Sequence, residues 1–270
     1  FALLRHCGPS DTRGFTVGTI TNGRHVCRHW DELTEVASTG CLDFLDISLD
    51  SGNADQHDAF RGRAGTFALA MQALIEAGVR LPNVRVGICS VLRADNAEGL
   101  IDLLGIASPH TPYFFIIPIQ PPPLASTNVL SHSYLIAFLQ RLRTTLQGIR
   151  HDRGLEVTVF LPGPYVYDAV EAGLFSWEDL SENSQGRVYA MTRVANHSLL
   201  YTCSVLPEQA CRVARIAYDG AYLGHLHFLQ AQAPEKYATG YIQHESIVRL
   251  YEKSIAPGSY FHQLLRARQS

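Results

Sequence analysis

Residues 42–52 read LDFLDISLDSG, and this stretch decides the fold class. The run from Leu42 to Leu49 is mostly apolar and short, and Asp50-Ser51-Gly52 is a turn signal that ends it. These features predict a strand over Leu42–Leu49. Apolar strands of this kind are typical of parallel sheets that are covered on both faces.

Strand and helix patterns alternate on both sides of this stretch, which is typical of βα units. Single crossover helices should place the strands parallel and in sequence order. Thr66 is expected to cap one helix and Gly78 to end it. The predicted strands are Phe15–Thr21, Leu42–Leu49, Val84–Leu92, Tyr113–Ile119 and Leu155–Leu161, and the predicted helices are Trp30–Ser38, Thr66–Gly78, Asp95–Leu104 and His132–Ile149.

The fold class that we expect is α/β, with a partial parallel (β/α) barrel over residues 1–162. The regular alternation is lost from about Gly163, so residues 163–270 should form a small, irregular α+β region. Within it, Val213–Leu223 has the pattern of a β-hairpin and Ile242–Lys253 that of a helix.

Composition excludes several classes of protein. The 270 residues are 46% hydrophobic and 17% charged, which excludes a disordered chain. The net charge of −3 gives no electrostatic basis for binding nucleic acid or an anionic membrane, and no apolar run approaches the roughly 18 residues of a membrane span. Six scattered cysteines without a C-x-x-C pair argue against a disulfide framework, so we expect a cytoplasmic protein.

Five short motifs follow one another in a particular order. They are Thr21-Asn22-Gly23, Ser48-Leu49-Asp50-Ser51, His57-Asp58-Ala59-Phe60-Arg61-Gly62, Gly65-Thr66-Phe67 and the loop residue Asn96. This order, with its spacing, resembles the middle of a radical S-adenosylmethionine (radical SAM) enzyme from about Thr16 to Gln120. That resemblance implies S-adenosylmethionine and a [4Fe–4S] cluster as cofactors, and a 5′-deoxyadenosyl radical as the reactive species.

The resemblance also implies site residues. Ser48 and Asp50 would face the ribose and methionyl end of the cofactor, and Arg61 would bind its carboxylate as a bidentate fork. Asn22 and Asn96 would lie at the same site, and Gln120 on the substrate side. Each also has an ordinary structural interpretation: Asn22 and Asp50 as turn residues, Asn96 as a loop or cap residue, and Arg61 as an ion-pair partner of Asp58.

Two hallmarks of that family are missing, namely the C-x-x-x-C-x-x-C cluster motif and the G-G-E-P segment. The opening Phe1-Ala2-Leu3-Leu4 looks like the end of an apolar helix, so we expect a truncated chain whose two hallmarks lie upstream of Phe1, and which is inactive as it stands. A degenerate relative that never bound a cluster is the alternative.

The C-terminal region resembles a degenerate SPASM or twitch region, in which cysteines bind auxiliary clusters. A hairpin with Asp219-Gly220 follows Cys211, but His225 and His227 stand where a cysteine normally follows. Only Cys203 and Cys211 remain as weak metal-ligand candidates, and a cluster needs about four ligands. We therefore expect no auxiliary cluster.

The first functional hypothesis is a radical SAM oxidoreductase or maturase that modifies a peptide or protein partner. The second is a non-catalytic scaffold, derived from the barrel, that binds such a partner. An unrelated barrel enzyme is disfavoured because no lysine and no recurring acidic or histidine ligands stand at the predicted strand ends.

Overall fold

The structure of the chain is a computed structural model. It describes residues 4–5, 8–12, 16–119, 130–182, 188–204, 221–222 and 240–241. Among these residues, none of the helices has the length and apolar character that a membrane crossing requires.

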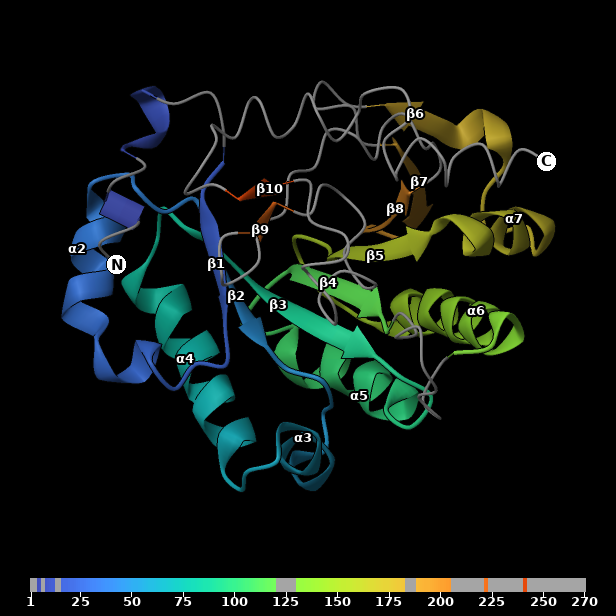
Figure 1. Cartoon of the computed structure of the whole chain (residues 1–270). Coiled ribbons are helices and arrows are strands. Elements are labelled where there is room, and N and C mark those ends of the chain that lie inside the picture. Colours follow the sequence, from blue (N-terminus) through green and yellow to red (C-terminus); the bar gives the residue numbers. More distant parts are fainter. Residues whose placement is uncertain are drawn as a thin grey trace.

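Five parallel strands lie side by side in sequence order, as the alternating pattern predicts (Figure 1). Each pairs in parallel with the next along the chain, and the register places Thr21 beside Ile47 and Ser48 beside Cys89. The order of the first four strands and their parallel direction are therefore confirmed. The strands are β1 (Gly18–Thr21), β2 (Phe44–Ser48), β3 (Arg85–Leu92), β4 (Tyr113–Pro118) and β5 (Glu156–Pro162).

Helices connect these strands, and four of them lie where the sequence predicts helices. These are α2 (Trp30–Ser38), α4 (Thr66–Arg80), α5 (Ala97–Ala107) and α6 (His132–Gly148). Two further helices, α3 (Ala54–Arg61) and α7 (Gly163–Glu171), were not predicted. Short 3-10 turns occur at η1 (Ser10–Thr12), η2 (Val26–Arg28) and η3 (Trp177–Asp179).

The predicted ends of the helix α4 were wrong at both termini. The residue at the N-cap is Gly65 rather than Thr66, and the capping oxygen comes from Asp58 of α3. The helix continues through Gly78 to Arg80, because a helical glycine costs only about 1 kcal/mol and here has no left-handed backbone that would end the helix.

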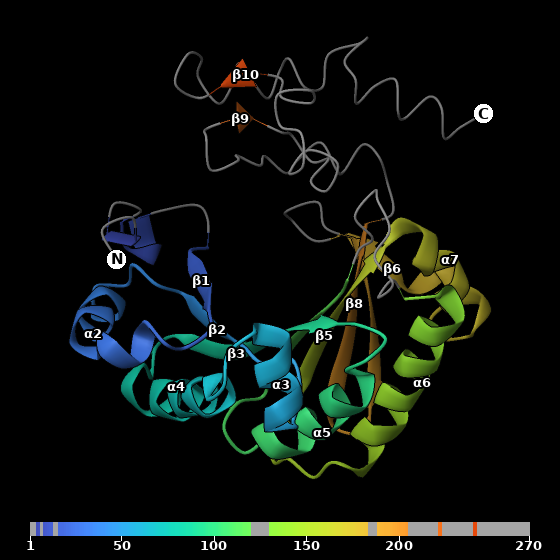
Figure 2. The ribbon, with the colours of Figure 1, turned by 60° about the horizontal axis from the view of Figure 1, so that its bottom comes forward.

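The sheet curves into an open trough with the helices along its outer, convex side (Figure 2). Strand β4 shows this directly, because Phe114 and Ile116 face the helices and are buried, whereas Tyr113, Phe115 and Ile117 face the concave side and are half-buried. Strands β2 and β3 are buried on both faces, as expected, apart from single positions. Burial of both faces does not extend to β4.

The same sheet continues past residue 162, which the sequence analysis did not foresee. Strand β8 (His197–Ser204) pairs in parallel with β5, and β7 (Val188–Val194) and β6 (Leu180–Glu182) add to it antiparallel. The fold is α/β, and within the described residues its eight-stranded sheet is mostly parallel and is not closed into a barrel.

A two-residue turn joins β7 to β8. It consists of Ala195 and Asn196, and Ala195 takes a positive φ of 54°. The turn carries no glycine, so the sequence gives no clear hairpin signal here. The boundary expected after residue 162 stays a prediction.

Most of the predicted tail lies outside the described residues. Of the hairpin expected over Val213–Leu223, the structure describes Ala221–Tyr222 as β9, which pairs antiparallel with β10 (Gly240–Tyr241). The predicted helix Ile242–Lys253 lies outside the described residues.

Candidate functional site

The loop after β2 leads directly into a short helix, α3, at the carboxyl edge of the sheet. The side chain of Asn53 accepts a hydrogen bond from the backbone N–H of Gln56 and so caps this helix. The helix ends at Gly62, whose φ of 67° is the left-handed conformation that glycine adopts without strain. This short helix places His57, Asp58 and Arg61 beside the end of β2.

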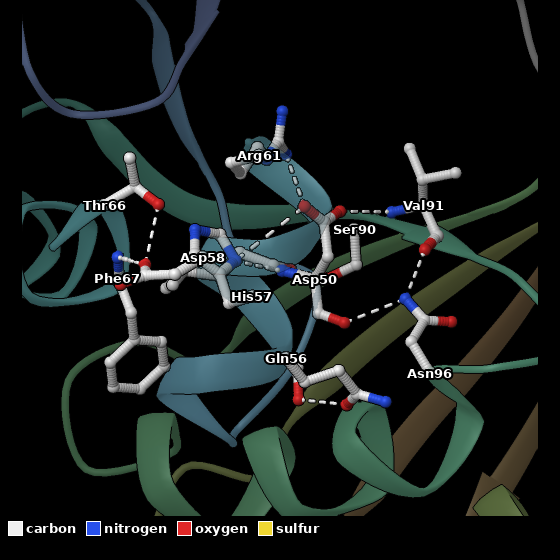
Figure 3. Close-up of polar contacts among 12 residues, drawn as sticks. Asp50, Gln56, His57, Asp58, Arg61, Thr66, Phe67, Ser90, Val91 and Asn96 are labelled. Atoms are coloured by element: carbon white, nitrogen blue, oxygen red, sulfur yellow. Dashed lines mark hydrogen bonds and ion pairs between the residues drawn. The ribbon is translucent and has the colours of Figure 1, made fainter. Parts of the chain in front are cut away.

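Asp50 lies at the centre of a buried polar network (Figure 3). Its Oδ2 atom lies 2.6 Å from Nη2 of Arg61, and its Oδ1 accepts a hydrogen bond of 2.9 Å from the backbone N–H of Val91. The Asp50 side chain is only 1% exposed. The network therefore joins the loop after β2, the end of α3 and the strand β3.

The His57 side chain holds the Asp50 backbone in place through a hydrogen bond. Its Nδ1 accepts a hydrogen bond of 3.1 Å from the Asp50 backbone N–H, and its ring packs edge-on against Phe67. An Nδ1 that accepts a hydrogen bond carries no proton, so the ring is neutral with its proton on Nε2. Burial lowers the pKa of His57, although the Asp50 carboxylate opposes the shift.

Asn96 clamps the two neighbouring loops together. Its Nδ2 donates hydrogen bonds of 2.8 Å to the carbonyl oxygens of both Asp50 and Val91. Its Oδ1 accepts from the backbone N–H of Arg93 at 2.7 Å. Asn96 is 3% exposed, so its side chain holds the rim of the site in place.

The Asp58 side chain stabilises the start of α4 instead of pairing with Arg61. Its carboxylate accepts hydrogen bonds from the backbone N–H groups of Gly65 and Phe67 and from the hydroxyl of Thr66. These bonds lower the pKa of Asp58. The ion pair between Arg61 and Asp58 that the sequence analysis considered is replaced by the pair between Arg61 and Asp50.

The concave face beside this network carries three further polar side chains. Asp46 and Ser48 are two residues apart on β2, so their side chains share one face of the sheet. Cys89 is the register partner of Ser48 on β3. Burial is the main reason that the pKa of Cys89 is raised to about 12, and the nearby carboxylates of Asp46 and Asp50 add to the rise. Cys89 is therefore a neutral thiol. Burial also raises the pKa of Asp46, against the lowering effect of Arg85.

The structure brings together four of the six predicted site residues. Asp50 contacts both Arg61 and Asn96 at the carboxyl ends of β2 and β3, and Ser48 lies there as the last residue of β2. Asn22 follows the end of β1 at the same edge of the sheet, but it is exposed and its Oδ1 accepts a local hydrogen bond from the backbone N–H of Arg24. Gln120 lies outside the described residues.

His57 belongs to one of the sequence motifs, but no role was predicted for it. The signal was available, because a histidine one turn before Arg61 on a helix lies on the same face as the arginine. The hydrogen bond from the Val91 backbone N–H to Asp50 was also not predicted, because every residue except proline has such a donor and the residue type gives no signal.

Metal ligands do not gather in the described part of the chain. There, no group of three or more His, Cys, Asp or Glu side chains is placed to hold an ion. Cys203 belongs to β8, and Cys211 lies outside the described residues, so their proposed role stays a prediction.

The comparisons with known proteins add no family. The sequence matches no model of a known protein family and no curated protein.

Proposed function

We propose that this chain is the S-adenosylmethionine-binding part of a radical SAM enzyme that modifies a peptide or protein. The ordered motifs, a curved parallel sheet and the convergence of Ser48, Asp50, Arg61 and Asn96 at its carboxyl edge support the proposal. In α/β sheets this edge is the usual place for a ligand.

The proposal rests mainly on the contacts and exposure of the Arg61 side chain. Its Nη2 pairs with Asp50, its Nε has no hydrogen-bond partner among the described residues, and the side chain is still 28% exposed. A guanidinium has five N–H donors, so the exposed part of Arg61 can still donate to the carboxylate of a ligand. A guanidinium that is anchored on one side and open on the other fits the carboxylate of an amino-acid moiety.

The other residues position this arginine and the cofactor. Asp50 orients Arg61, while His57 and Asn96 hold the Asp50 backbone. The Ser48 hydroxyl, on the concave face, is the group that would bind a ribose hydroxyl. Ser48, Asp50 and Arg61 would hold S-adenosylmethionine, which together with a reduced [4Fe–4S] cluster would supply radical chemistry for hydrogen abstraction from the substrate.

Titration calorimetry with S-adenosylmethionine tests the site. Arg61→Gln should weaken binding about tenfold, because a charge-assisted hydrogen bond is lost. Arg63→Gln, which changes a neighbouring exposed arginine, is the matched control and should leave affinity unchanged. Equal affinities for all three proteins would contradict the assignment of Arg61.

Iron content separates the enzyme from the non-catalytic scaffold. The proposal requires cluster cysteines from outside residues 1–270, because the C-x-x-x-C-x-x-C motif is absent here. The full-length protein, purified without oxygen, should then contain about four irons per cluster and absorb visible light. A full-length protein that contains no iron would instead support a scaffold that binds a peptide or protein without radical chemistry.

A further inference from the structure

A hollow of about 520 Å³ lies far from the site around Asp50, between the helices α6 and α7 and the strand β7. Strand β7 is five strands from β2 in the sheet, which corresponds to about 24 Å along it. It also runs antiparallel to β8, so its end lies at the edge where the parallel strands begin. This edge is opposite to the carboxyl edge that carries Asp50.

Two guanidinium groups line the hollow. Arg143 comes from α6 and is half-buried, and Arg193 comes from the end of β7 and is exposed. Within the described part of the chain neither has an acidic side chain at ion-pair distance, whereas Arg141 of the same helix pairs with Glu98. The two arginines therefore give the hollow positive charge that no ion pair within the described residues neutralises.

One carboxylate also lines the hollow, but it is already engaged. Oδ2 of Asp179 accepts hydrogen bonds from the backbone N–H of Ser176 at 2.7 Å and from its hydroxyl at 2.9 Å. With two cations and one anion, the side chains around the hollow keep a net positive charge. An anionic group is the complementary ligand.

The rest of the lining is mixed, because apolar side chains stand beside Gly173 and the hydroxyl groups of Ser176 and Thr192. A small inorganic anion would leave the apolar part uncovered. Met191 is 51% exposed and Val170 is half-buried, whereas Leu174 and Phe175 are buried behind them. A ligand that fits both parts carries an acidic group next to apolar side chains.

The edge of β7 at the hollow is only partly covered. The Thr192 hydroxyl donates a hydrogen bond of 3.3 Å to the carbonyl oxygen of Leu174. Strand β6 covers β7 only from Val188 to Ala190, and in the described residues no strand pairs with Met191–Val194 on that side. An uncovered strand edge presents backbone donors and acceptors to an incoming extended chain. Such a chain would place alternate side chains toward the hollow.

We propose that this hollow is a docking site for an extended acidic peptide, which adds as a strand to the Met191–Val194 edge of β7. Side chains alternate between the two faces of the added strand, so carboxylates on one face would approach Arg143 and those on the other would approach Arg193 beside Met191. This inference is independent of the cofactor assignment, and it gives the proposed peptide or protein partner a recognition surface outside the reaction site.

Fluorescence anisotropy with the full chain tests the site without cofactor or cluster. The probe is a short fluorescein-labelled peptide in which pairs of glutamates alternate with pairs of valines, so that both faces of the strand carry carboxylates. The control peptide replaces glutamate with lysine. Arg143→Gln and Arg193→Gln should each weaken binding about fivefold, and added salt should weaken it further. Arg153→Gln, in an exposed turn, is the matched control and should leave binding unchanged.

Hydrogen exchange of the backbone amides tests the mode of binding. The peptide should slow exchange at Met191–Val194, because strand addition protects these amides. Met191→Glu keeps an exposed position exposed and adds a carboxylate, so it should abolish binding without unfolding the chain.

Three results would overturn the proposal: no binding of the acidic peptide, equal binding of the lysine peptide, or binding without protection of Met191–Val194. Because S-adenosylmethionine is absent from these experiments, none of these results bears on the function proposed for Asp50 and Arg61.

Discussion

The guanidinium of Arg61 lies 2.6 Å from the carboxylate of Asp50, and the two side chains are 28% and 1% exposed. This pair ties the end of α3 to the loop after β2. It also explains why a short helix with little apolar surface, in which only His57 is buried, stays against the sheet. Polar contacts rather than hydrophobic area hold it there.

The pair should contribute to stability as well as to binding. Arg61→Gln leaves the Asp50 carboxylate buried without its cation and should lower the free energy of unfolding by about 3 kcal/mol. Asp50→Asn keeps an acceptor for Val91 and leaves only a partly exposed cation, so it should cost about 2 kcal/mol. In urea denaturation the double variant should lose less than the sum of the single losses, and strict additivity would contradict a direct interaction.

Close packing under the site should make Gly99 of α5 intolerant of a side chain. A Cβ atom at Gly99 would overlap Oγ of Ser51 and Oε1 of Gln56, which are hydrogen-bonded to each other at 2.6 Å. Gly99→Ala should therefore destabilise the protein by about 1–3 kcal/mol.

Gly105 offers the matched control for this change. It lies in the same helix, and nothing lies within 4 Å of a Cβ atom there. Gly105→Ala should stabilise the protein by about 0.5–1 kcal/mol, because alanine favours the helix. Thermal denaturation of both variants gives the comparison, and a shift in the same direction for both would contradict the packing argument.

The capping role of Asp58 predicts a pH dependence. Its pKa is lowered in the folded chain, so the carboxylate contributes stability at neutral pH that is lost as the pH falls from its ordinary pKa of about 3.9 through the lower folded value. Asp58→Ala should reduce the melting temperature at pH 7 and flatten this acid-side loss. Asp102→Ala, at an exposed position of α5, should leave the acid-side loss unchanged.

The parallel core of the fold was predictable because each strand is a short apolar run between turn signals. Leu42–Leu49 and Tyr113–Ile119 show this most clearly, and the structure places β2 and β4 within them. The strands β6 to β8 were not predictable in the same way. The turn at Ala195 and Asn196 lacks glycine, and β7 is polar at Thr192 and Arg193.

Part of the site was predictable from the sequence, namely Ser48, Asp50, Arg61 and Asn96, whereas their contacts and the roles of His57 and the Val91 amide were not. Two successive motifs place Asp50 and Arg61 eleven positions apart in the chain, but only the end of α3 determines that they meet. The sequence offers Asp58 as an equally reasonable partner for Arg61. That choice is made by the start of α4, whose free N–H groups take the Asp58 carboxylate instead.

Buried His57 should make the protein sensitive to mild acid. Its pKa is lowered by burial, so below about pH 6.5 the unfolded chain binds a proton more readily than the folded chain does. Stability should fall as the pH drops from that value through the lower folded pKa.

The variant His57→Asn tests this assignment, because its side chain keeps an acceptor for the Asp50 N–H and removes the titration. In urea denaturation at several pH values, His57→Asn should lose less stability on acidification than the unchanged protein. His110→Asn, at an exposed position, should behave like the unchanged protein. If His57→Asn keeps the full acid-side loss, another group is responsible.

Asp46 should be a site where removing a charge stabilises the protein. Burial raises its pKa, so above that raised value the folded chain bears the cost of a buried carboxylate, and below the ordinary pKa of about 3.9 the cost disappears. Its ion-pair partner Arg85 is 3.8 Å away and 42% exposed, and the guanidinium also lies over the rings of Phe44 and Tyr113. Asp46→Asn should therefore raise the free energy of unfolding at pH 7, and the gain should vanish at acid pH. Urea denaturation at both pH values measures it, with the exposed Asp152→Asn as a control that should show no gain. A loss of stability for Asp46→Asn at pH 7 would mean that the ion pair with Arg85 outweighs the cost of burial.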